Sequence, residues 1–368
     1  MLNQLTIIII TYKRYGFLKR LLIFFSSYQL KAKILVLDSS PDHPKDERLI
    51  ELLSHKNLSW KKYDSDIFFA HKIAEGCKHI QTEYAVLCAV DDFLIPHALE
   101  RCIDFLSEHQ DYASAHGLYF NHSSYEKTRS NNFRIDPLYE QGQSSEEKTS
   151  AERVTAYLGG KTRNYPMYAV HRSSTFRLIW SETKKYVSDE GLSELFPCCL
   201  SFSYGKMKII PMFYNSREPN NYDWYTIDTQ SEWYNKIYSK DKLKHAVIGL
   251  SKHLSKLDRL SLEEAENVSQ NSFQDYLKRA TQNLNYQKSF KNKLSFLFLN
   301  RFKQKLRIPR RILGWIYLIC YQGCHPSIYP EHLDDFKRVR GAVLSAGLNS
   351  EELNKSRKEL TKQLKGKV

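Results

Sequence analysis

The sequence predicts an α/β protein built on an open, mostly parallel sheet, and three observations carry that prediction. Short runs of aliphatic and β-branched residues occur at residues 5–10 and 33–38, as in strands buried on both faces. Between them, residues 17–28 carry apolar side chains at the three- and four-residue spacing of a helix. Strand, helix and strand in this order form a βαβ unit, which pairs its strands in parallel through a right-handed crossover.

Later segments repeat this alternation. The same criteria predict strands at 58–63 and 83–89 and helices at 47–54, 67–80 and 96–109. Pro96 suits the first turn of the last helix because its fixed φ is already helical. Residues 1–120 are therefore expected to form one sheet flanked by helices.

The middle of the chain is expected to complete the same domain. Residues 121–150 are polar, and we expect a long surface loop near the site or a partly mobile lid. Residues 151–225 mix aromatic and aliphatic segments, and we expect them to supply the half of the domain that binds an acceptor.

A change in composition near residue 235 divides the chain. Beyond it helical spacing dominates and basic residues accumulate, so we expect a domain at 1–235 and a basic helical appendage at 236–368. Residues 286–317 interleave aromatic side chains with Lys and Arg, which fits a solvated or partner-facing helix, or binding to an anionic membrane surface. Nucleic acid is not an expected partner, because no recognition motif accompanies the charge.

The cysteines and the hydropathy pattern bear on location. The seven cysteines show no repeated paired spacing, and the first residues lack the features of a signal peptide. No stretch of about 18 apolar residues occurs. We therefore expect reduced thiols and a cytoplasmic protein, with a peripheral position on the inner face of the membrane as the alternative.

Polar residues follow three of the predicted strands. In an open parallel sheet, ligands bind beyond the carboxyl ends of the strands, so these residues should face one crevice. The candidate ligand contacts among them are Thr11, Tyr12, Arg14, Asp38, Ser39, Asp91 and Asp92.

The acidic pair Asp91-Asp92 ends the fourth predicted strand. Carboxylates at such a position suit Mg²⁺ or Mn²⁺, which take carboxylate oxygens together with substrate phosphate oxygens. The ion would neutralise a leaving diphosphate. The alternative is a helix N-cap, because acidic residues favour the start of the helix that follows.

Asp38 is a second acid at a strand end. It could accept hydrogen bonds from a nucleoside base or ribose, or it could be a turn-forming residue ahead of Ser39-Ser40-Pro41. No glycine-rich phosphate loop follows the first strand, where Gly16 is the only glycine. This argues against a dinucleotide-binding fold and against a P-loop.

The segments 6–14, 36–40 and 84–96 resemble the family-2-like glycosyltransferases with the GT-A fold. Residues 74–99 are similar to a bacterial subfamily of that group, and the resemblance extends over about residues 4–225. It implies a GT-A-like fold and an activated-sugar donor, usually UDP- or GDP-linked. In the inverting members it implies transfer without a covalent intermediate.

The chain departs from the family pattern at one position. The family places a further Asp two positions before Asp91, and this chain has Ala89 there. Asp91 is then the expected metal ligand, with Asp92 near the donor sugar. Metal coordination is expected to be weaker, or assisted by another residue.

An inverting transferase needs a general base to deprotonate the acceptor hydroxyl. In the family this acid precedes a helix and lies about a dozen residues before a glycine. Glu194, ahead of Gly205, is the leading candidate, and Asp189 and Glu190 compete with it. Each could also be a solvated acid at a helix start.

Two arginines complete the candidate set. Arg217 follows an apolar run and could bind the diphosphate bidentately, or form a surface ion pair. Arg14 could approach the nucleotide or remain solvated. Together these residues predict a metal-assisted glycosyltransferase that moves a sugar from a nucleotide-sugar donor to a glycan or lipid-linked acceptor in bacterial surface polysaccharide synthesis.

Two alternatives remain open at this point. A nucleotidyltransferase on a similar sheet would carry a basic, glycine-rich loop after its first strand, and this chain does not. A non-catalytic nucleotide-binding module is the other, and the missing acid at Ala89 favours it.

Overall fold

A computed structural model gives the fold of the chain. It describes residues 1–125, 132–137, 143–162, 164–188, 191–217, 240–296, 335, 337–339 and 341–342.

The first four strands run in parallel and lie in the order β3-β2-β1-β4. They are β1 (Leu5–Thr11), β2 (Lys33–Asp38), β3 (Leu58–Lys62) and β4 (Tyr84–Ala89). Their register aligns the carboxyl ends, because Thr11 lies across from Asp38, and Asp38 lies across from Lys62. The predicted βαβ unit and its parallel pairing are confirmed.

Five further strands extend the sheet to nine, in the order β3-β2-β1-β4-β8-β6-β9-β5, with β7 paired to β6. They are β5 (Phe93–Leu94), β6 (Tyr112–Tyr125), β7 (Asn132–Pro137), β8 (Val170–Arg172) and β9 (Lys206–Arg217). β8 is antiparallel to both β4 and β6, whereas β6 and β9 are parallel. The open α/β sheet expected from the sequence is confirmed, with parallel pairing among its first four strands and both parallel and antiparallel pairing among the others.

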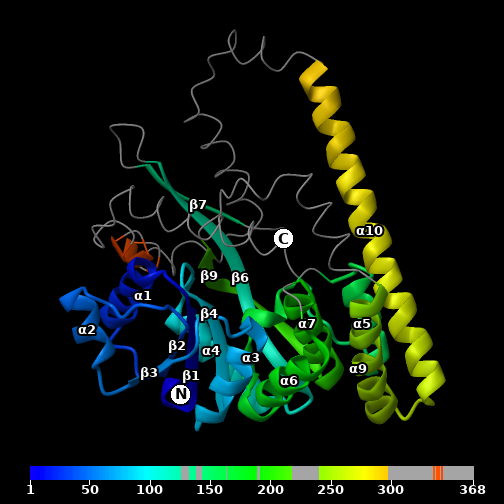
Figure 1. Ribbon diagram of the computed structural model, residues 1–368, viewed down its shortest axis with the longest axis horizontal. Coiled ribbons are helices and arrows are strands. Elements are labelled where there is room, and N and C mark those ends of the chain that lie inside the picture. The colour runs from blue at the N-terminus through cyan, green and yellow to red at the C-terminus, as the bar shows by residue number, and fades with distance from the viewer. Residues whose placement is uncertain are drawn as a thin grey trace.

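Helices cover both faces of this sheet (Figure 1). One face carries α1 (Tyr15–Ser27), α2 (Glu47–Leu53) and α4 (Pro96–Glu108), and the other carries α3 (Phe69–Gly76), α5 (Ser150–Leu158), α6 (Ser173–Tyr186) and α7 (Leu192–Tyr204). Short 3-10 helices lie at Leu2–Gln4, Cys77–His79 and Pro166–Tyr168. Within β1, Ile7 and Ile9 pack on the first face and Ile8 on the second. The strand is apolar throughout because both of its faces are covered.

The polar segment at 121–150 contains strands, so the expectation of a long loop there is wrong. β6 continues to Tyr125, and its second half pairs antiparallel with β7. Further on, Ser145 forms an isolated bridge to Met207 of β9. Cross-strand pairing satisfies backbone donors and acceptors whatever the polarity of the side chains, so the composition of this segment did not reveal it.

Two helices follow residue 235, as expected: α9 (Lys240–Asp258) and α10 (Leu262–Phe296). Ala246 and Leu250 of α9 and Phe273 of α10 are fully buried in the core on the α7 face. In Figure 1, α10 continues well beyond α5 and α9. The boundary at 235 stays a prediction, but the first helices beyond it pack on the core of the preceding domain.

Residues near the C-terminus return to the N-terminal part of the sheet. The Tyr28 hydroxyl, just after α1, donates a hydrogen bond of 2.6 Å to Asp335 Oδ1. Val339 is fully buried in the α1 face of the core. Most of the basic aromatic segment 286–317 lies outside the described residues. Within the part of the chain that the structure describes, no helix combines the length and apolarity needed to cross a membrane.

Candidate functional site

The carboxyl ends of β1, β2 and β4 meet through direct contacts. The Ser39 N–H donates to the Thr11 carbonyl at 3.2 Å, and the Lys13 N–H donates to Ser40 Oγ at 2.8 Å. Lys13 adopts a left-handed conformation with φ of 52°, which is uncommon for a residue with a side chain. Arg14 then reaches across to Asp91. The structure thus brings together the three sets of residues that the sequence placed at one edge.

Asp91 is held by two arginines of the α1 segment. Arg14 Nη2 lies 2.7 Å from Asp91 Oδ2, and Arg20 Nη2 donates to the Asp91 carbonyl at 3.0 Å. The buried Arg20 guanidinium lies 4.9 Å from the ring centre of Phe17 and 5.0 Å from that of Phe93. Burial acts to raise the pKa of Asp91, but Arg14 outweighs it and the pKa is lowered. Asp91 is therefore a carboxylate at neutral pH.

Asp92 has a different environment. Burial raises its pKa to about 7, against the opposing charge of Arg217, and the neighbouring Asp91 carboxylate adds to the rise. Arg217 Nε lies 3.5 Å from Asp92 Oδ2. No donor among the described residues makes a hydrogen bond to that oxygen. The predicted Arg217 is therefore part of the site, paired with one of the two acids.

The N-cap interpretation of the acidic pair is wrong. Helix α4 is capped at Ile95, and no side chain caps it by a hydrogen bond. Neither carboxylate caps the helix, so the burial of the two carboxylates beside arginines requires another explanation. A buried carboxylate without a full set of partners is costly in a protein interior.

The acidic pair could hold a divalent cation together with the phosphates of a substrate. No group of three or more His, Cys, Asp or Glu side chains within the described ranges is placed to hold a metal ion. Two carboxylates nevertheless suffice for Mg²⁺ when substrate phosphates supply other ligands. Asp92 Oδ2 is available for such a role, whereas Asp91 Oδ2 already binds Arg14.

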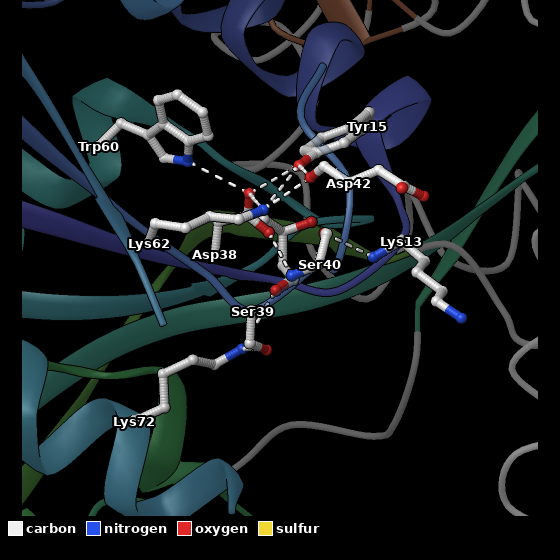
Figure 2. A network of polar contacts seen from close by, with 10 residues as sticks. Lys13, Tyr15, Asp38, Ser39, Ser40, Asp42, Trp60, Lys62 and Lys72 are labelled. Atoms are coloured by element: carbon white, nitrogen blue, oxygen red, sulfur yellow. Dashed lines mark hydrogen bonds and ion pairs between the residues drawn. The ribbon is translucent and has the colours of Figure 1, made fainter. Parts of the chain in front are cut away.

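Asp38 is the centre of a polar network at the ends of β2 and β3 (Figure 2). Its Oδ2 accepts hydrogen bonds from Tyr15 at 2.8 Å, Lys62 at 3.1 Å and Trp60 at 3.3 Å. Its Oδ1 accepts from the Ser40 N–H at 2.8 Å. The bond from the Ser40 N–H closes a turn, which is the alternative role that the sequence allowed for Asp38.

The same network limits what Asp38 can offer a ligand. Its residue surface is 0% exposed, and four protein donors already use its oxygens. Contact between Asp38 and a nucleoside stays a prediction. The exposed part of the cluster belongs to Lys62, whose side chain is 29% exposed.

Lys72 of α3 forms hydrogen bonds to residues at the carboxyl ends of both β1 and β2. The residue is buried, and its Nζ donates to Ser39 Oγ at 2.8 Å and to the Thr11 carbonyl at 3.1 Å. Burial lowers the pKa of Lys72 to about 8, and the Asp38 charge opposes that shift. Figure 2 shows the ammonium group pointing at Ser39 from the side opposite the Asp38 network. Thr11 Oγ1, beside it, is buried without a hydrogen-bond partner among the described residues.

Glu194 lies in the first turn of α7 and is exposed. Burial raises the pKa of Tyr168, and the charge of Glu194 adds to this rise, as do those of Asp92 and Asp91 more weakly. The charges of the leading candidate base and of the acidic pair therefore both act on Tyr168. The competing candidates Asp189 and Glu190 lie outside the described residues. Tyr12 is half-buried in the loop after β1.

Several residues of the site escaped the sequence analysis. Lys62 could have been found, because it lies one residue before the end of the strand predicted at 58–63, and it is in register with Asp38. Arg20 and Lys72 have a weaker signal, as charged residues on the apolar faces of their helices. Nothing local marked Tyr15 and Trp60, because each reaches Asp38 from a different element.

The comparisons with known proteins find matches among solved structures. No family model matches the chain, and no curated protein matches it. Among solved structures, it is similar to Staphylococcus aureus TarS 1–349, with 12% identity and a TM-score of 0.49 over 74% of this chain and 71% of that one. A structure of TarS 1–349 in complex with UDP-GlcNAc gives 11% identity and a TM-score of 0.42, over 76% of this chain and 92% of that one. At such TM-scores the likeness carries no conclusion about activity.

Proposed function

We propose that the chain is a glycosyltransferase that binds a nucleotide-sugar donor at the carboxyl edge of β1, β2 and β4. The observation that carries this proposal is the arrangement of Arg14-Asp91 and Arg217-Asp92 beside the β1 and β2 loops. Arginines bind phosphate oxygens bidentately, and loops at strand ends bind nucleotides in open α/β sheets. Two buried oxygens, Thr11 Oγ1 and Asp92 Oδ2, are without hydrogen-bond partners in the described part of the chain, and a bound ligand would supply them.

The donor diphosphate belongs next to Arg14 and Arg217. Each guanidinium now faces a carboxylate, so its charge is held in place before a ligand arrives. Donors fixed in advance stabilise developing negative charge without reorganisation, which is the usual source of catalysis at a leaving group. Arg20 acts through Asp91, because it holds the backbone of that residue rather than facing the ligand.

A divalent cation, Mg²⁺ or Mn²⁺, would be held by Asp91 and Asp92 together with the diphosphate. When bound it supplies positive charge to the leaving group. Asp92 contributes the oxygen that lacks a donor, and its pKa of about 7 makes cation binding weaker below neutrality, where the carboxyl holds its proton.

The acceptor hydroxyl belongs on the side of Tyr168 and Glu194. Glu194 is exposed at the start of α7 and is the proposed general base, which takes the hydroxyl proton during inverting transfer. Asp189 and Glu190 remain the alternatives for this role. UDP or GDP is the proposed nucleotide part of the donor.

We further propose that the acceptor is a glycan or a lipid-linked sugar of bacterial surface polysaccharide synthesis. A cytoplasmic protein with peripheral attachment to an anionic membrane through residues 286–317 fits this role. The net charge of +14 supports an anionic partner.

A thermal-shift and calorimetric titration with UDP and GDP, each with and without Mn²⁺, tests the donor site and the metal together. Binding should be lost in Arg14→Met combined with Arg217→Met, and should persist in the paired control Arg48→Met with Arg101→Met. Both control arginines have exposed side chains. Binding that survives the first pair unchanged would contradict the site.

The products then distinguish the alternatives. With a nucleotide-sugar donor, release of the nucleoside diphosphate supports glycosyl transfer, whereas release of pyrophosphate supports a nucleotidyltransferase. Tight nucleotide binding with neither product, across a panel of sugars, supports a non-catalytic module.

A further inference from the structure

A basic pocket lies where α3, the end of α6 and the start of α9 meet. Its volume is about 420 Å³, and no carboxylate is among its described lining residues. Most of the lining side chains can donate hydrogen bonds, and those used below are His71, Lys184, Lys185, Ser188, Lys242 and His245. We call it the α3–α6–α9 pocket.

This pocket adjoins the start of α3, the helix whose Lys72 bonds the ends of β1 and β2. Arg177, near the start of α6, donates to the Ile80 carbonyl beyond the end of α3, whereas Lys184, near the end of α6, pairs with Glu75. The two helices are therefore antiparallel, and the pocket lining brings Lys184 and Lys185 of α6 together with His71 in the first turn of α3. His71 lines the pocket from that first turn, one position before the lysine that bonds the β1 and β2 ends.

The pocket carries an excess of positive charge. Lys184 pairs with Glu75 at 2.7 Å and Lys185 pairs with Glu182 at 2.6 Å. These lysine side chains are 44% and 60% exposed, and such exposed pairs are weak enough to exchange for a ligand anion. Lys242 has no carboxylate within ion-pair distance in the described ranges, so three ammonium groups face two carboxylates.

We propose that the α3–α6–α9 pocket binds a phosphate group carried by the acceptor, an inference that rests on the glycosyltransferase function. Lysine ammonium groups bind phosphate as point charges, and three of them line the pocket, with no carboxylate among its described lining residues. Ser188 and the imidazoles of His71 and His245 add further donors. An acceptor anchored there lies beside the start of α3, the helix that contacts the edge where the donor sugar is proposed to bind.

Glycerol 3-phosphate is the probe for this pocket, titrated calorimetrically into the full chain with and without saturating UDP. The test variant is Lys242→Glu, and the matched control is Lys244→Glu, because Lys244 is an exposed lysine of the same helix outside the pocket lining. We expect Lys242→Glu to weaken glycerol 3-phosphate binding by about tenfold or more, and Lys244→Glu by less than about twofold. Both variants should keep the wild-type UDP affinity and unfolding temperature.

Four outcomes would overturn the proposal. Three of them are no binding of glycerol 3-phosphate to the wild-type chain, equal losses in both variants, and equal binding of glycerol 3-phosphate and glucuronate. A fourth is loss in Lys242→Glu of binding to phosphatidylglycerol vesicles but not of binding to glycerol 3-phosphate, which would assign the pocket to a lipid surface. Failure of UDP to bind would contradict the donor site, and the titration without UDP still tests the pocket.

Discussion

Lys72 donates a hydrogen bond of 2.8 Å to Ser39, and this buried contact joins helix α3 to the loop that follows β2. The same ammonium group also bonds the Thr11 carbonyl at the end of β1. One cation therefore fixes the relative position of two strand ends where the donor is proposed to bind. Its burial comes at a cost, because desolvation lowers the pKa of Lys72 to about 8.

Replacing this cation should loosen the loops without unfolding the sheet. In Lys72→Met, Ser39 Oγ loses the Lys72 donor and the Thr11 carbonyl keeps only the Ser39 N–H, and a buried group left unpaired costs about 1–3 kcal/mol. We expect weaker nucleoside diphosphate binding by calorimetry and a lower unfolding temperature. Lys78→Met is the control, because Lys78 is exposed and its loss removes only a surface pair with Glu75. Equal effects in the two variants would show that Lys72 does not position the loops.

Asp91 should be essential for donor turnover. Asp91→Ala removes the carboxylate that pairs with Arg14 and that is proposed to hold the cation. We expect donor turnover to be abolished while circular dichroism and the unfolding transition show a folded protein. Asp111→Ala is the control, because its side chain is 56% exposed and pairs only with Lys206 in the described part of the chain. Turnover near the wild-type value in Asp91→Ala would rule out the assigned site.

Two buried histidines should make the fold sensitive to acid. Burial lowers the pKa of both His116 and His171 to about 4, from 6.5 in the unfolded chain. The folded state binds fewer protons than the unfolded chain. The contribution of the neutral histidines to the free energy of unfolding is therefore complete above pH 6.5 and is lost as the pH falls toward 4. Each histidine can contribute up to about 3 kcal/mol.

Urea unfolding at pH 7 and pH 4.5 measures this loss. In His116→Gln, the free energy of unfolding should fall less between the two pH values than in the wild type, whatever the variant's stability at pH 7. His79→Gln should keep the wild-type pH dependence, because His79 is exposed. An unchanged pH dependence in His116→Gln would contradict the lowered pKa.

The return of the chain to α1 should contribute to stability. Val339 is fully buried in the core on that face, so Val339→Ala leaves a cavity and should cost about 1–3 kcal/mol in the free energy of unfolding. Leu257→Ala is the control, because Leu257 is 41% exposed, and it should cost less than about 1 kcal/mol. Equal losses in denaturant unfolding would mean that residues near 339 do not stabilise the domain.

The strand pattern was predictable because its cause is local. β1, β2 and β4 are apolar along their whole length since helices cover both faces, and that composition can be recognised without a structure. The hairpin of β6 and β7 was missed for the opposite reason. Its pairing depends on backbone hydrogen bonds, and the alternation of Phe133 and Ile135 with polar residues in β7 is too short to stand out within a polar segment.

The sequence by itself determined the open sheet, the edge at which its polar residues gather, and the candidates Arg14, Asp91 and Arg217. Strand direction places those ends together by geometry alone. Only the tertiary structure decided how each residue is used. Whether a carboxylate meets a guanidinium, as Asp91 does, or is enclosed by donors from three elements, as Asp38 is, depends on contacts between residues far apart in sequence. Such contacts, and the burial that shifts the pKa of Lys72, arise only when the helices and strands pack together.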